Sequence, residues 1–157
     1  MGRSGFNIAE QGHVVQMLAP VSLGAATTSE CISMENWSHV SFICMKGAGS
    51  AATIRLEECT AFAGTGAATR IFSYCIEEVA AGDTPAAALQ SATTAGIALS
   101  TGSGIYMIIE VDADELTDGY PYLRLKCADP GATHLGAWVA VLSGGRYQKD
   151  ITATAIV

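Results

Sequence analysis

The stretch "SHVSFICM" (residues 38–45) shows the pattern that decides the fold. Val40, Phe42 and Cys44 recur at every second position, and His39 lies on the alternate set. Successive side chains of a β-strand point to opposite faces of its sheet, so one face of this segment is apolar. A period of two sustained over eight residues predicts a β-strand with one face in the core.

The same alternation recurs along the chain, in segments separated by Gly-rich turns. We expect strands at residues 13–18, 38–45, 53–59, 69–79, 104–112, 122–127, 134–142 and 151–157. A chain of 157 residues fits one domain. Short strands at regular spacing predict an all-β fold, a β-sandwich or jelly roll of about eight to nine strands.

Three segments carry more detailed predictions. The stretch "HLGAWVAVL" (134–142) is apolar at both parities, which predicts a central strand covered on both faces. In residues 53–59, Cys59 falls on the polar parity, so a bulge at Glu57–Glu58 is expected to turn it inward. In "DTPAAALQSA" (83–92), Asp and Pro offer a helix of one or two turns as an alternative to irregular structure.

The first twelve residues follow a different pattern. They combine glycines and short polar residues with an isolated apolar pair, Phe6 and Ile8. We therefore predict an extended N-terminal arm over residues 1–12, followed by a single β-sandwich domain over residues 13–157. Such arms are often frayed, and an apolar pair can anchor one to a neighbouring molecule.

Charge and hydropathy exclude several classes of partner. The net charge is −7 and the eight basic residues are scattered, so the sequence predicts no nucleic-acid binding. No apolar run reaches the ~20 residues of a spanning helix, and the N-terminus lacks the apolar core of a signal peptide. We expect no membrane partner, and we expect a protein that is made and kept in a cytoplasm or in something assembled there.

No motif specifies a reaction. His13, His39 and His134 lie far apart in the sequence, and neither a nucleophile elbow nor a phosphate-binding loop is present. Trp37 and Trp138 lie inside expected strands, so they are predicted to belong to the core or an interface, with sugar stacking as the alternative. We predict no catalytic residue, no cofactor and no enzymatic activity.

The five cysteines lack the close pairs that zinc sites use. We expect them to be buried, reduced thiols that behave as small hydrophobic side chains, and we predict no metal site.

The stretch "EVDADELTDGYPYLRLKC" (110–127) opens with five carboxylates in nine residues. An EF-hand reading fails, because its frames place Leu123 or Leu125 where the twelfth-position Glu belongs. Asp112 and Glu115 have instead the spacing of a capping box around one helical turn, and Asp118–Gly119 can reverse the chain. We predict a polar bend, with a surface calcium site at 110–119 as the alternative.

Four long segments together resemble small virion proteins encoded among the head genes of tailed bacteriophages. They are "APVSLGAATTSECISMENWSHVSFICMKGAGSAATIRLEEC", "EEVAAGDTPAAAL", "IIEVDADELTDGYPYLRLKC" and "GGRYQKDITATAIV", which cover most of the chain. The resemblance is one of overall pattern and includes no catalytic motif. It implies a capsid decoration (cement) protein, a β-sandwich or jelly roll that oligomerises and binds adjacent major capsid subunits.

These observations lead to one functional prediction. We expect a non-enzymatic virion protein that forms a homo-oligomer, a dimer or trimer, and binds the major capsid protein on the capsid surface. Four apolar residues near the two ends are the expected contacts: Phe6, Ile8, Tyr147 and Ile151. The alternatives are another virion part (a head-fibre base, tail component or head–tail connector) or a carbohydrate- or calcium-binding β-sandwich module.

Overall fold

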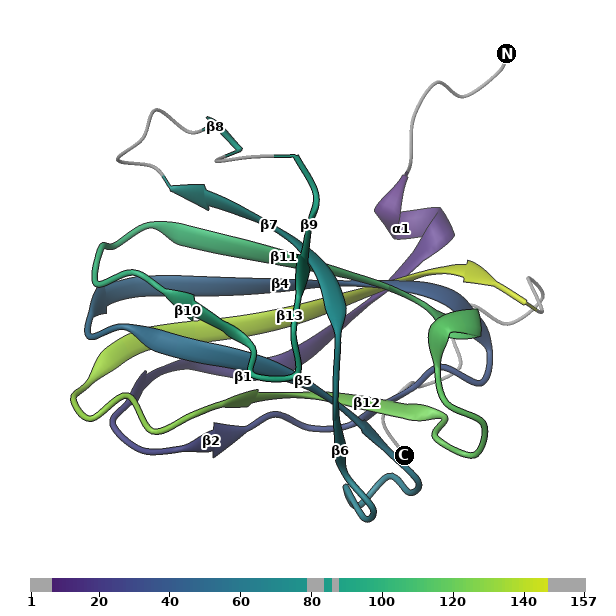
Figure 1. Cartoon of the computed structure of the whole chain (residues 1–157). Coiled ribbons are helices and arrows are strands. Elements are labelled where there is room, and N and C mark those ends of the chain that lie inside the picture. The colour runs from purple at the N-terminus through teal and green to yellow at the C-terminus, as the bar shows by residue number, and fades with distance from the viewer. Residues whose placement is uncertain (1–6, 79–83, 86–87, 147–157) are drawn as a thin grey trace.

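The alternating segments pair into two antiparallel sheets, which form the layers of a sandwich in this computed structural model (Figure 1). The structure describes residues 7–78, 84–85 and 88–146. Within these residues the larger sheet has seven strands, in spatial order β1 (Gly12–Leu23), β13 (His134–Gly145), β4 (Trp37–Gly49), β11 (Ile105–Asp112), β7 (Phe72–Glu78) and β8 (Thr84–Pro85), with β9 (Gln90–Ala92) also paired to β7.

The smaller sheet is built around two strands of opposite direction. Its six described strands are β10 (Ile97–Leu99), β5 (Ala52–Cys59), β12 (Tyr122–Cys127) and β2 (Thr27–Thr28) in spatial order, with β3 (Ile32–Ser33) paired to β12 and β6 (Ala68–Arg70) paired to β5. The all-β sandwich predicted from the alternation is therefore confirmed.

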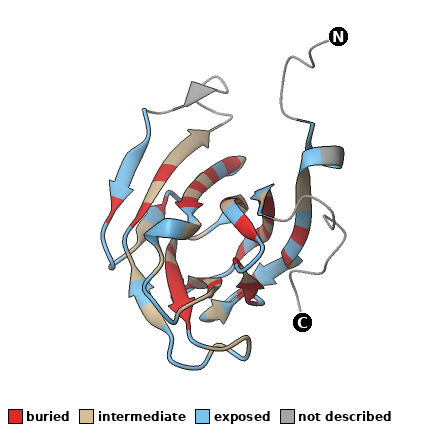
Figure 2. Cartoon of the chain, turned by 90° about the vertical axis from the view of Figure 1, so that its right-hand side faces the viewer, coloured by how far each residue is buried: buried red, intermediate tan, exposed pale blue. Residues whose placement is uncertain are grey.

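The core lies between the two sheets, where the inward residues of both meet (Figure 2). Phe42 and Met107 from the larger sheet and Leu125 from the smaller sheet are fully buried. Burying such a side chain contributes about 1.5–3 kcal/mol. Trp37 and Trp138 belong to the same core, as the sequence predicted.

The predicted bulge in β5 is absent. Cys59, Glu57 and Leu56 pair in unbroken register with Tyr122, Arg124 and Leu125 of β12. Cys59 is nevertheless buried, on the outward parity of the strand. The inward position falls to Glu58, which accepts hydrogen bonds from Arg70 Nη1 (2.8 Å) and from the backbone N–H of Thr117 (3.2 Å). These bonds to the charged form hold the pKa of Glu58 below its usual value, although its burial acts in the opposite direction.

The two stretches with helical signals differ in outcome. Residues Ile8–Gln11 form one short helix, α1, where an extended arm was expected; residues 1–6 lie outside the described residues. In residues 83–92, the described parts contain β8 and β9 instead of a helix.

The acidic bend forms as predicted. Residues Ala113–Glu115 make one 3-10 turn, η2, and the backbone N–H of Asp112 donates to Glu115 Oε2 at 3.4 Å, as a capping box requires. The reversal follows at Thr117–Tyr120, where the Tyr120 N–H donates to the Thr117 carbonyl. Gly119 has a φ of +85°, the conformation that favours glycine in this kind of turn.

Candidate interaction surface

The outward side of the larger sheet carries a continuous set of apolar residues, which we call the apolar face. Its members come from four neighbouring strands and lie side by side across them. In one row Gln16 pairs with Val139, Val139 with Ile43, and Ile43 with Ile108. The apolar face consists of the outward residues Val14, Ile43, Met45, Gly47, Tyr106, Ile108, Leu135, Ala137 and Val139, together with one uncharged polar residue, Gln16.

The apolar face carries no charge. Neither β1 nor β13 contains an Asp, Glu, Lys or Arg residue, and β4 contains one lysine, Lys46, whose side chain is buried. This absence contrasts with a net charge of −7 for the whole chain. Charge on this side of β4 and β11 is confined to one end of the two strands, where His39, Glu110 and Asp112 lie.

No described layer covers this face. The prediction that residues 134–142 are covered on both sides is wrong for most of the stretch: the outward Val141 is buried, but Leu135 is exposed and Val139 is only partly buried. Leu135 and Val14 remain 54% and 55% exposed. Large exposed apolar patches on a soluble fold commonly mark interaction sites.

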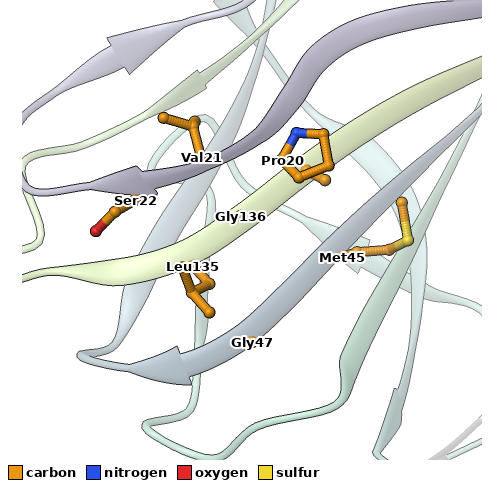
Figure 3. A pocket seen from close by; sticks show the side chains of 8 residues that line it. Pro20, Val21, Ser22, Met45, Gly47, Leu135 and Gly136 are labelled. Carbon is orange, nitrogen blue, oxygen red and sulfur yellow. The ribbon is translucent and has the colours of Figure 1, made fainter.

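A shallow hollow of about 310 Å³ lies at one end of the apolar face (Figure 3). Pro20 from β1, Leu135 from β13 and Met45 from β4 border it. Gly47 leaves space here, because a Cβ at this position would lie 3.0 Å from the Leu135 Cβ. An open hollow with apolar walls can receive a protruding apolar side chain, but it offers no enclosed site for chemistry.

A polar cluster lies on the same side of the sheet, at the end opposite the hollow. His39 Nδ1 lies 2.7 Å from Asp112 Oδ1, and His39 Nε2 lies 2.8 Å from Glu110 Oε2. The Ser41 hydroxyl donates to the same Glu110 oxygen at 2.6 Å. The cluster arises because Asp112 and Glu110 of β11 pair directly with His39 and Ser41 of β4.

The electrostatics of this cluster favour a charged imidazole. Partial burial lowers the pKa of His39, but its hydrogen bonds to Asp112 and Glu110 act in the opposite direction and leave the pKa above the ordinary value of 6.5. Both ring nitrogens are engaged, on opposite edges of the ring, so histidine and carboxylates do not converge on one point. Within the described residues no group of three His, Cys, Asp or Glu side chains is placed to hold a metal ion.

The cluster contains the residue types of a hydrolytic triad, but its geometry differs. Ser41 donates to Glu110, and it lies 3.3 Å from His39 Nε2, which already contacts that carboxylate. None of the described hollows is lined by these residues. The arrangement cross-links two strands of the sheet through an ion pair.

The outward side of the smaller sheet is charged. Glu57 is buried and accepts hydrogen bonds from Arg124, with Nη2 at 2.7 Å, and Lys126 Nζ lies 3.6 Å away. Burial lowers the pKa of Arg124, but its bond to Glu57 outweighs this and raises it. Arg55 donates to the Ala95 carbonyl. We call these four residues the charged face.

A second buried basic residue, Lys46, lies on the inward side of β4, next to Gly47 of the hollow. The Lys46 ammonium group donates to the carbonyls of Gly47, Gly49 and Gly102. Burial lowers the pKa of Lys46, although the charge of Glu78 acts in the opposite direction. His134 is also buried, and burial together with the Lys46 charge lowers its pKa. Its Nδ1 has no hydrogen-bond partner within the described residues.

The four residues predicted as contacts are only partly placed. Ile8 begins α1 and is 45% exposed, whereas Phe6, Tyr147 and Ile151 lie outside the described residues. Sequence reasoning missed the apolar face itself, although the double apolar parity of residues 134–142 was the signal for it.

The alternative sites lose support from the geometry. Trp37 and Trp138 are 4% and 2% exposed, so the two indoles offer no platform for a sugar. Asp112 and Glu115 of the acidic bend are engaged with His39 and the Asp112 backbone.

The cysteines for which free thiols are described behave as small apolar residues. Cys31, Cys44, Cys59 and Cys127 are buried and free. Burial raises the pKa of Cys59 to about 11, so this thiol stays protonated at neutral pH. Among the helices of the described residues, none has the length and apolar character to span a bilayer.

Comparison with known proteins identifies a fold relative. No protein-family model matches the chain, and no curated protein matches it significantly. Among solved structures, the SPBc2 prophage-derived protein YomS is similar, with a TM-score of 0.50 and 6% identity over 85% of this chain and 93% of the other. The infectious bursal disease virus (Gx strain) structure aligns with 86% of this chain and 42% of the other at 9% identity, with a TM-score of only 0.26. The chain therefore shares its fold with a prophage-derived protein.

Proposed function

We propose that this chain is a non-enzymatic structural protein of a tailed-phage virion, of the capsid decoration type. In this role it binds major capsid subunits on the outside of the head after assembly in the host cytoplasm. The observation that carries the proposal is the apolar face, an uncharged surface that no described layer of the sandwich covers. A protein that acts by association needs such a surface and needs no reactive pocket.

Two further observations support the proposal. The fold is similar to that of a prophage-derived protein over most of both chains. The sequence pattern resembles small virion proteins encoded among phage head genes. The described hollows are open, and the cluster of His39, Ser41 and Glu110 is internally paired, which favours a structural role over catalysis.

The test is to locate the protein in the particle. Virions of the phage or induced prophage that encodes the chain would be purified, analysed by mass spectrometry and labelled with antibodies for electron microscopy. We expect the chain in the particles and label distributed over the head. A gene deletion should lower the temperature at which heads release DNA. Absence from purified particles would overturn the proposal, and label on the tail or at one vertex would favour another virion part.

A further inference from the structure

We propose that the apolar face is a two-fold contact surface between two copies of this chain. The proposal assigns the surface described above to a second copy, so a capsid subunit would bind the resulting dimer through other surfaces, and it rests on the associative role proposed for the chain. The resulting dimer stacks the larger sheets of two copies against each other, with β13 near the symmetry axis.

Charge is the first argument for a second copy. In a two-fold contact the same patch lies on both sides, so every charged group near the axis meets its own counterpart. The chain carries a net charge of −7, and carboxylates crowd the bend at residues 110–118. Among the described surfaces, the apolar face is an extended area that can meet itself without bringing like charges together.

Shape is the second argument. Leu135 is 54% exposed and lines the hollow together with Gly47, Gly136 and Ala137. An exposed apolar side chain and an apolar recess therefore lie on one patch, and a two-fold contact brings each of them against the same patch of the other copy. In a two-fold contact, Leu135 of each copy can enter the hollow of the other.

The sequence of β13 is the third argument. Its inward residues Trp138, Ala140 and Leu142 pack in the core. Its outward residues Ala137 and Val139 are apolar as well, and they are only partly buried. Apolar residues on both faces are typical of strands covered on both sides. Since no described layer supplies the second cover, a second molecule would complete the pattern.

Association through the face is favoured over association through the sheet edge. β1 forms one edge of the larger sheet, but it contains Pro20, and its pairing with β13 shifts register at Gln16/Leu18 and at Leu18/Val21. Proline and irregular register are features that hinder the addition of a further strand. The edge is therefore protected over its second half, whereas the face is open.

The size of the surface sets the expected affinity. Four strands ~4.8 Å apart, each contributing about five residues of ~3.4 Å, give a footprint of roughly 330 Å² per copy. Two copies would then bury about 650 Å² in total, which is the size of a weak, transient contact. We expect a dissociation constant on the order of a hundred micromolar.

Sedimentation equilibrium of the purified full chain tests the proposal. Between about 1 and 500 µM the average mass should rise from 16.2 kDa toward twice that value. Leu135→Glu should weaken association at least about tenfold, because each copy would place a carboxylate in the apolar contact. Thr28→Glu is the matched control: it adds the same charge at an exposed position of the smaller sheet and should change the dissociation constant less than twofold.

The outcomes separate this proposal from the proposed function. Circular dichroism of both variants at low concentration must show the wild-type fold and melting curve. A wild-type chain that stays monomeric, or equal effects of the two variants, overturns the dimer. A monomer whose binding to particles is lost in Leu135→Glu would assign the face to a capsid subunit. If the chain dimerises in solution but is absent from virions, the dimer proposal holds and the proposed virion role is wrong.

Discussion

The outward sides of the two sheets differ in how their side chains are accommodated at the protein surface. Both sheets expose one face, yet the charged face satisfies its own groups, because Glu57 binds Arg124 and lies near Lys126. The apolar face has no such internal pairing, and residues such as Leu135 remain half-exposed. The difference shows that the alternation of apolar residues in the sequence defines the core. The chemistry of the outward residues decides whether the opposite face of each sheet is stable in contact with water or is better covered by a partner.

The largest effect is expected on the charged face. Glu57→Gln removes the carboxylate that pairs with Arg124, and it leaves a largely buried guanidinium without its counter-ion. Breaking a buried pair from one side is strongly destabilising, so we expect a loss of about 2 kcal/mol in the free energy of unfolding. Urea unfolding at low protein concentration measures this change.

The matched control lies on the apolar face. Gln16→Ala removes an exposed polar side chain of β1 and should change the free energy of unfolding by less than about 0.5 kcal/mol. An equal loss in the free energy of unfolding for Glu57→Gln and Gln16→Ala would contradict the contrast between the charged face, whose groups are paired, and the apolar face, whose groups are not.

A smaller, pH-dependent effect is expected at the polar cluster. The pKa of His39 is raised in the folded chain, so its stabilisation is complete below the unfolded value of about 6.5 and is lost as pH rises through the folded pKa. His39→Gln should therefore cost about 0.5–1 kcal/mol at pH 5.5 and much less at pH 8.5. Urea unfolding of both proteins at the two pH values provides the measurement.

His134 contributes to the pH dependence of stability with the opposite sign to His39. Its pKa is lowered in the folded chain, so its contribution favours unfolding as pH falls below about 6.5. Both wild type and His39→Gln should therefore lose stability on the acid side, with the variant losing more. A cost of His39→Gln that is larger at pH 8.5 than at pH 5.5 would contradict the assignment.

Salt should affect self-association only modestly. Because the apolar face carries no charge, raising NaCl from about 0.05 to 0.5 M removes no attraction across the contact and screens the repulsion between two acidic chains. We expect the dissociation constant to fall about two- to fivefold, as measured by sedimentation equilibrium. A large rise would indicate an interface built from ion pairs, such as one that uses the charged face.

Calcium should have the smallest effect of all. Three of the five carboxylates at residues 110–118 are engaged locally: Glu110 and Asp112 contact His39, and Glu115 accepts from the Asp112 backbone. Millimolar CaCl₂ should therefore leave the melting temperature unchanged within about 1 °C. A rise of several degrees would reveal a calcium site and revive the binding-module alternative.

Local pattern predicted much of the fold but little of the surface. The strands around residues 38–45, 104–112 and 122–127 followed from the period of two, and the capped bend followed from the spacing of Asp112 and Glu115. These features depend on near neighbours in the chain. A sequence reader can therefore recover them without knowing the packing.

The missed features depend on distant partners. Glu58 faces inward because Arg70 and Thr117 satisfy it, and the polar cluster exists because β4 and β11 pair in one register. Cross-strand register is a tertiary property that alternation does not reveal. The uncovered side of β13 was read as a second core face, since an apolar pattern does not distinguish a partner within the chain from one outside it.

The carbonyl cage around Lys46 has a practical consequence for following local motion. Acylating reagents attack an uncharged amine that they can reach, and Lys46 is 3% exposed whereas the side chain of Lys126 is 39% exposed. Covalent labelling of Lys46 therefore requires the segments around Gly47, Gly49 and Gly102 to separate. The labelling rate measures the frequency of this local opening. Lys46 is thus an intrinsic probe of local unfolding in this protein.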